Sequence, residues 1–238
     1  MSRKTTLVKL LDMLRVAARL SLNPAHNAQN RSSQVTMLQT EQERLWEDFD
    51  WPHLRIERQV PLQAGQRYYD TPEDINIDRI ERIELFTNGC WHKLEPGIDA
   101  QHYSAWNSDL DQRSWPPRRW KLHEDEDIEL WPISDTNGDP ATLEGYLKFT
   151  GIKNLAPLVD DDHRADLDDT MLVGYVAARM LAASGAKDAK LVLDGASSRY
   201  AKLRGRLTPR TSFRMFGVGS PPPPRKFMIT SYRPPSES

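Results

Sequence analysis

The sequence predicts an α+β fold in which two pairs of helices form a four-helix bundle and an antiparallel β-sheet or sandwich is inserted between the pairs. Apolar residues recur at helical spacing towards both ends of the chain, whereas in the middle they alternate with polar residues. Prolines and basic residues dominate the last part, which predicts an extended arm. The expected segments are N-terminal helices at 1–52, the β insert at 53–159, C-terminal helices at 160–205 and the basic, Pro-rich arm at 206–238.

Two helices are expected before the β insert. A leucine-rich stripe predicts the first over about residues 3–21, and Pro24 follows its end. A second apolar stripe continues until Pro52, which closes it. Within this stripe, Thr40 and Glu43 have the spacing of a capping box that could restart the helix.

The β insert contains two recognisable hairpins. In the clearer one, Asn88-Gly89 joins a strand over 80–87 to a strand over 90–94, because Asn-Gly supplies the positive φ angles of a type I′ turn. A second hairpin is expected to turn at the acidic residues 124–126. Short strands at this spacing, without long helices between them, favour an antiparallel sheet or small sandwich.

Three further elements complete the expected order. A strand is expected over 143–149, where apolar residues and glycine alternate with polar ones. Helical spacing returns over 167–181, directly after an acidic run, and Ser184-Gly185 marks a break. A final helix is expected over 186–203.

Charge is distributed unevenly along the 238 residues. The whole chain carries −2, but the stretch from Arg199 to Ser238 holds nine basic residues against Glu237 alone and therefore carries +8, leaving −10 for the rest. An acidic body with a basic tail usually indicates a partner. The tail also contains aromatic residues, which solvated linkers lack, so we expect it to become ordered on another surface. An ordinary disordered tail is the alternative.

The sequence argues against disulfides, membrane spans and metal centres. Cys90 is the only cysteine, which excludes an intrachain disulfide and a multi-cysteine metal cage. No apolar run reaches the ~18–20 residues of a membrane span, so a soluble chain made in the cytoplasm is expected. Asp135–Asp139 imitates the start of a calcium loop, but Pro140 and Tyr146 stand where that loop needs glycine and glutamate. No metal and no cofactor are expected.

The acidic run at 160–169 allows two interpretations. Its carboxylates could offer oxygen ligands to magnesium. Its position before a helix favours a simpler role, since carboxylates stabilise the positive end of a helix and one of them can cap it.

Catalysis is not expected either. The chain has no metalloprotease, hydrolase-elbow or phosphate-loop motif. Glu124 and Asp127 could form the carboxylate pair of a glycosidase, yet a chain with 34 acidic residues offers many such pairs. Trp115 and Trp120 lie among basic residues and could stack nucleic-acid bases, but the acids beside them would repel phosphate. We therefore expect tryptophans of a core or an interface.

Several short sequence motifs lie near the boundaries of the expected elements. They are Trp46 with Asp50–Leu54, Tyr68–Pro72 with Ile80–Ile83, Pro117–Trp120 with Asp127–Pro132, Gly145–Phe149, Leu158–Asp162, Tyr175–Ala178, and Ser198–Tyr200. Together with the order helix pair, β insert, helix pair and basic arm, they resemble the head–tail adaptor (connector) proteins of tailed bacteriophages over residues 35–204. The turn at 124–127 is more acidic than that family's pattern, and the arm after Arg206 matches no family phrase.

The resemblance implies a structural virion protein and not an enzyme. Such a subunit would form a ring of about twelve copies beneath the portal protein, through heterologous contacts. The ring would join the portal to a tail or nozzle/stopper protein and leave a channel with acidic or neutral walls, through which DNA passes without specific binding. The expected location is the neck of the virion, with assembly in the host cytoplasm and no membrane contact.

The arm is expected to bind the portal or a neighbouring subunit. Its aromatic residues would bury apolar area there and its basic residues would pair with acidic groups. The expected contact residues are Arg206, Arg210, Phe213, Arg214, Phe216, Arg225, Lys226, Phe227, Tyr232 and Arg233. The alternative function is a nucleic-acid-binding protein that uses the same arm as its basic contact.

Overall fold

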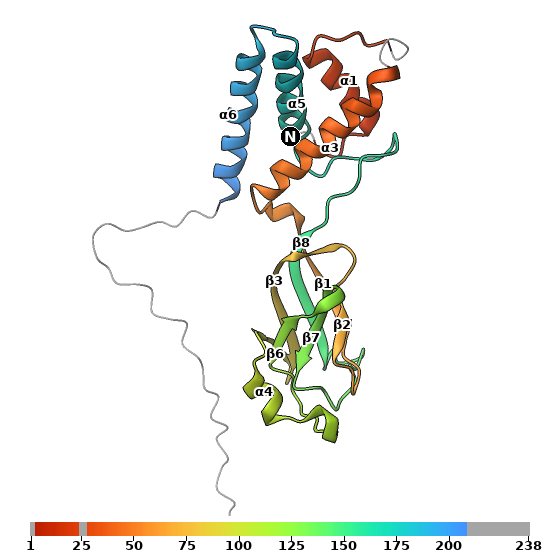
Figure 1. Cartoon of the computed structure of the whole chain (residues 1–238), viewed down its shortest axis with the longest axis vertical. Coiled ribbons are helices and arrows are strands. Elements are labelled where there is room, and N and C mark those ends of the chain that lie inside the picture. The colour runs from red at the N-terminus through yellow and green to blue at the C-terminus, as the bar shows by residue number, and fades with distance from the viewer. Residues whose placement is uncertain (1–2, 24–27, 209–238) are drawn as a thin grey trace, which may run out of the picture. The chain divides into compact units, whose positions relative to one another are not determined.

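A computed structural model describes residues 3–23 and 28–208 of the chain. Residues up to Leu207 form one compact unit. It is an α+β unit with five α-helices and two four-stranded sheets among the described residues, as the sequence predicts in class (Figure 1). The expected arm lies outside the described residues except for 206–208.

The helices differ from the expected ones mainly at their ends. The first is shorter than expected, because Arg3 and Thr6 form bridges with Asp168 and Arg164 and do not join the helix. The α-helices are α1 Leu7–Ala17, α3 Arg31–Glu47, α4 Ala100–Ala105, α5 Asp169–Ala183 and α6 Ala189–Leu207.

The prediction of a capping box at Thr40 and Glu43 is wrong. Both residues lie inside α3, which begins at Arg31 after a short 3-10 turn. Glu43 accepts a hydrogen bond from the Gln39 side chain one turn earlier instead of capping the backbone. The helix is continuous because residues on both sides of this point, among them Leu38 and Leu45, are buried in the same core.

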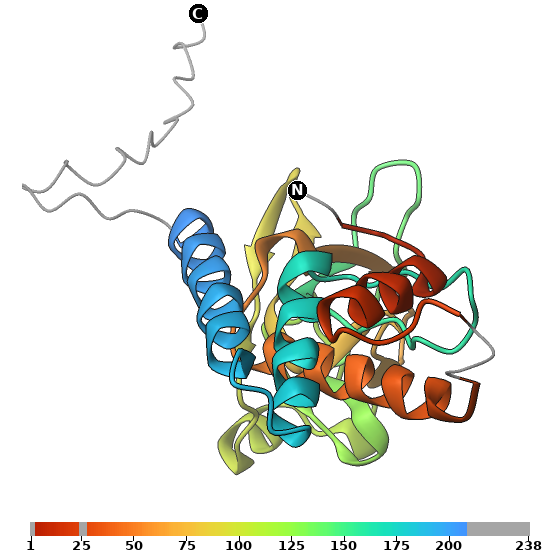
Figure 2. The ribbon, with the colours of Figure 1, turned by 90° about the horizontal axis from the view of Figure 1, so that it is seen from above.

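Helices α1, α3, α5 and α6 form the helical part of the protein, and α5 lies at its centre. Each of α1, α3 and α6 packs against it, and Figures 1 and 2 both show α5 between α1 and α6. Gly174 lets α6 approach closely, since a Cβ there would lie 3.0 Å from the Cβ of Ala196. This packing around one helix does not confirm the expected four-helix bundle.

The strands form two separate sheets. The first has the order β1-β8-β3-β4 and the second β2-β7-β6-β5, and every pair is antiparallel except β5 with β6. The first sheet contains β1 Arg55–Pro61, β3 Ile75–Thr87, β4 Cys90–Lys93 and β8 Tyr146–Lys153. The second contains β2 Tyr68–Asp70, β5 Glu95–Pro96, β6 Arg119–Leu122 and β7 Asp127–Trp131.

Both expected hairpins are confirmed. Asn88 and Gly89 have φ angles of 52° and 75° and join β3 to β4. The acidic turn joins β6 to β7 as a short 3-10 turn, Glu124–Glu126. Strand β3 begins earlier than expected, at Ile75, and its pairing with β8 shifts register before Arg82.

The two sheets together form the β part of the protein. Alternation of apolar and polar residues along its strands determines which side chains form its core. Leu147 and Phe149 of β8 are fully buried, together with Ile83 and Leu85 of β3 and Ile128 of β7. These residues belong to both sheets, so the apolar faces of the two sheets share one core.

Asp168 joins α5 to α6 from inside the protein. Its fully buried side chain accepts from the Met171 N–H at 3.0 Å, which confirms that a carboxylate of the acidic run caps this helix. It also accepts from Arg199 at 2.6 and 2.8 Å. Burial opposes ionisation, but the hydrogen bonds from Arg199 and Met171 outweigh it, so the pKa of Asp168 lies below its ordinary value.

Replacing Asp168 by alanine should lower the free energy of unfolding by about 2–3 kcal/mol, because it removes a helix cap and leaves Arg199 without its carboxylate. Urea unfolding followed by circular dichroism measures the change. Asp160→Ala, which removes an exposed carboxylate of the same acidic run, should change it by no more than about 0.5 kcal/mol. Equal losses in the two variants would contradict this role.

The contribution of Asp168 should also depend on pH with a defined sign. A carboxyl whose pKa is lower in the folded state stabilises the fold above its unfolded-state pKa of about 3.9, and this stabilisation is lost as the pH falls through the folded-state value. The stability difference between wild type and Asp168→Asn should stay constant above about pH 5 and shrink below about pH 4. Urea titrations over this range measure it, and a difference that grows on acidification would refute the assignment.

Candidate functional site

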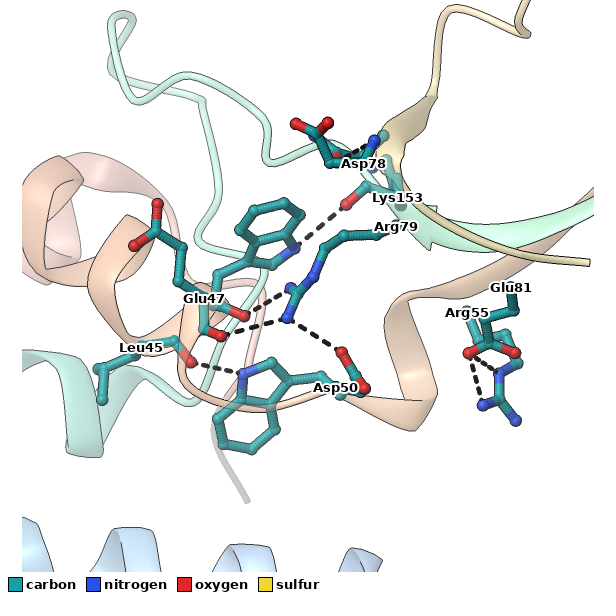
Figure 3. A network of polar contacts seen from close by, with 11 residues as sticks. Leu45, Glu47, Asp50, Arg55, Asp78, Arg79, Glu81 and Lys153 are labelled. Atoms are coloured by element: carbon teal, nitrogen blue, oxygen red, sulfur yellow. Dashed lines mark hydrogen bonds and ion pairs between the residues drawn. The ribbon is translucent and has the colours of Figure 1, made fainter. Parts of the chain in front are cut away.

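Arg79 of β3 lies against the C-terminal end of α3, where the helical part meets the first sheet (Figure 3). Its Nη1 donates to the carbonyl oxygen of Trp46 at 2.7 Å, and its Nη2 donates to that of Glu47 at 3.2 Å. Nη2 also lies 3.0 Å from the Asp50 carboxylate. The guanidinium carbon lies 4.3 Å from the centroid of the Trp46 ring. A cation here satisfies helix carbonyls that have no intrahelical donor and interacts favourably with the helix dipole.

Two indole groups complete this junction. Trp46 Nε1 donates to the carbonyl oxygen of Lys153, the last residue of β8, at 3.2 Å. Trp51 is fully buried and its Nε1 donates to the carbonyl oxygen of Leu45 at 2.9 Å (Figure 3). The end of α3 is thereby bonded to both β3 and β8. These polar groups hold the two parts of the protein together through bonds within the chain.

Three further tryptophans pack in the β part. Trp115 and Trp120 are partly buried against the core of the β part. Trp131 is buried and donates to the carbonyl oxygen of His102 at 2.8 Å. This agrees with the expectation that Trp115 and Trp120 belong to a core or an interface.

Much of the acidic run is engaged by neighbouring groups of the chain. Asp161 pairs with Arg31, and Asp160 lies 3.3 Å from His163. Asp166 accepts from the backbone N–H of Ala156 at 3.0 Å. Within residues 3–23 and 28–208, no group of three or more His, Cys, Asp or Glu side chains is arranged to hold a metal ion.

Of the residues expected to bind a partner, only Arg206 belongs to the described part of the chain. It is exposed in the last turn of α6. The remaining ones lie outside the described residues, and their role stays a prediction. They are Arg210, Phe213, Arg214, Phe216, Arg225, Lys226, Phe227, Tyr232 and Arg233.

Two open apolar grooves on the helical part were not expected from the sequence. The α1–α5 groove has a volume of about 680 Å³ and the α3–α5–α6 groove one of about 660 Å³. Val16 in the first is 62% exposed and Leu193 in the second 43%, so each groove leaves apolar surface in contact with water. Helical spacing alone could not reveal them, because a groove depends on which helices pack together. The α1–α5 groove is lined by Met13, Val16, Leu22 and Val173, among others, and the α3–α5–α6 groove by Tyr175, Ala178, Ala182 and Leu193.

Comparison with known proteins gives one family. The model of the SU10 adaptor protein family matches residues 8–223, which include both the helical and the β part. No match was found among curated proteins. None of the helices in the described ranges has the length and apolar character that crossing a membrane requires.

Arg79→Ala should destabilise the protein by about 2–3 kcal/mol, because the half-buried guanidinium satisfies two helix carbonyls and stacks on an indole ring. Arg55→Ala is the matched control. It also removes an arginine of the first sheet, but the Arg55 side chain is 53% exposed and, among the described residues, bonds only Glu81. Its loss should therefore cost less than about 1 kcal/mol. Urea unfolding of both variants measures the difference. Equal effects would refute the proposed role of Arg79.

Proposed function

The chain belongs to the SU10 adaptor protein family, and from that premise we propose that it is a ring subunit connecting the portal of a tailed bacteriophage to its tail. The observation that carries the proposal is the family match over residues 8–223. The role is structural: the subunit acts through its surfaces and not by catalysis. It belongs in the neck of the virion, after assembly in the host cytoplasm.

The two apolar grooves support a ring. A closed ring of identical subunits needs heterologous contacts, in which each subunit uses two different faces. The α1–α5 groove and the α3–α5–α6 groove use different helices besides α5, so they provide two distinct apolar surfaces. Exposed apolar surface of this kind is typical of protein–protein contacts. A ring of about twelve copies would match the portal above it.

The arm is the proposed contact with the portal or with a neighbouring subunit. Aromatic side chains on an extended segment can bury apolar area on a partner, and the basic residues between them favour an acidic surface. The opposite side of the ring would meet the tail or stopper protein. DNA would pass through the ring without specific binding, since a lumen rich in phosphate contacts would retain it.

Replacing the four aromatic anchors Phe213, Phe216, Phe227 and Tyr232 by serine should weaken binding to purified portal rings at least tenfold, because it removes the apolar contact area of the arm. Negative-stain electron microscopy and titration of labelled chain onto portal rings measure this. The matched control replaces four neighbouring hydroxyl residues, Ser212, Ser220, Thr230 and Ser231, by alanine and should bind like wild type.

Wild-type affinity in the serine variant would refute the role of the arm. Absence of any ring on the portal with the wild-type chain would refute the adaptor function itself.

A further inference from the structure

A cavity of about 660 Å³ opens on the β part, where β4 passes into β5 and faces α4 and the start of β6. Its walls include Lys93, Arg118 and the half-exposed indole of Trp106. Thr87 also lines it; this residue is 4% exposed and its hydroxyl has no hydrogen-bond partner among the described residues. The family match does not assign a role to this cavity.

The cavity carries uncompensated positive charge. Arg119 on its wall pairs with Glu95 at 2.6 Å, so these two charges cancel. Lys93 and Arg118 are exposed, and neither has an ion-pair partner within the described residues. Their charge favours an anionic occupant.

His102 adds a polar group to the same wall. Its Nδ1 accepts from the backbone N–H of Asp99 at 3.1 Å, and the neutral ring therefore carries its proton on Nε2. The wall thus combines two cations, an imidazole N–H donor and an aromatic surface. This combination suits carboxylate side chains presented on a short loop.

A matching group of carboxylates lies at the other end of the same hairpin. Strand β6 leads from Arg119 at the cavity to the acidic turn Glu124–Glu126, and its four residues span about 13 Å at ~3.3 Å per residue. Glu124 and Glu126 are exposed and, in the part of the chain that the structure describes, their carboxylates have no ion-pair partner.

The turn is held in place by its backbone and cannot fold back onto the cavity. The hydroxyl of Thr71 donates to the carbonyl oxygen of Glu126 at 3.1 Å, and the N–H of His123 donates to that of Asp127 at 2.8 Å. Because β6 and β7 are paired between the turn and the cavity, the two charged ends stay apart within one chain. Only a second molecule can bring them together.

We propose that the acidic turn of one copy docks in the cationic cavity of the next copy. Turn and cavity are different surfaces of the same subunit, so the contact can repeat from copy to copy as a heterologous contact and link the β parts around a ring. This inference rests on the proposed ring function and names a contact within it. Since its attraction is electrostatic, high salt weakens it.

The test uses two full-length charge-reversal variants. The turn variant carries Glu124→Lys and Glu126→Lys, and the cavity variant carries Lys93→Glu and Arg118→Glu. Each variant alone places like charges at every contact, so ring formation on portal should fall at least tenfold. An equimolar mixture should recover it, because the lysine turn then meets the glutamate cavity and the acidic turn meets the cationic cavity.

The matched control is Glu73→Lys with Asp78→Lys, which reverses two exposed acids elsewhere in the β part and should assemble like wild type. Circular dichroism of each variant checks that it is folded. Rings formed equally well by either variant alone, or no recovery in the mixture of folded variants, would overturn the contact and leave the adaptor function standing. Wild-type chains that form no ring on portal would overturn the proposed function and this inference with it.

Discussion

The helical part depends on one buried carboxylate. Asp168 starts α5 by capping its backbone and binds Arg199 of α6 through two nitrogens, so the central helix and its last neighbour are joined at one point. A buried charge is tolerated only when its hydrogen bonds are satisfied, and here they come from both helices. Because α1 and α3 also pack on α5, the position of this single helix decides how the whole helical core is arranged.

The β part is coupled to that core at the end of α3. Arg79 bonds the last carbonyls of this helix, and the indole of Trp46 bonds the end of β8. Strand β8 lies between β1 and β3, so the strand that leads back to the helices is also the centre of the first sheet. A force on the β part therefore reaches the helices through β8 and β3, which are hydrogen-bonded to neighbouring strands on both sides, and this suits the proposed role of joining the portal to the tail.

The sequence predicts the features whose causes are local. Asn88-Gly89 specifies its turn by backbone conformation alone, and the acids before α5 include the residue that caps it. The capping box at Thr40 failed because burial of Leu38 and Leu45 continues the helix across it. The central place of α5 and the contact of Arg79 with Trp46 join residues far apart in the chain, and no local pattern encodes them. No local pattern encodes the grooves or the cavity beside Arg118 either, since these also depend on how distant elements pack. Most of the predicted contact residues of the arm lie outside the described part of the chain.

The ion pairs distinguish charges that stabilise the fold from exposed charges that can bind a partner. The buried carboxylates of Asp168 and Glu129 each have an arginine partner within 3 Å, because an unpaired buried charge would be strongly destabilising. Charges in water cost little when unpaired, so Lys93, Arg118, Glu124 and Glu126, which have no ion-pair partner in the described part of the chain, need none in a single subunit. Such charges add little to folding but strongly affect which partner binds and in which orientation. Because the acidic turn and the cationic cavity lie at opposite ends of one hairpin, each copy can offer one of them to the copy before it and the other to the copy after it, and repetition of such a contact is what a heterologous ring requires.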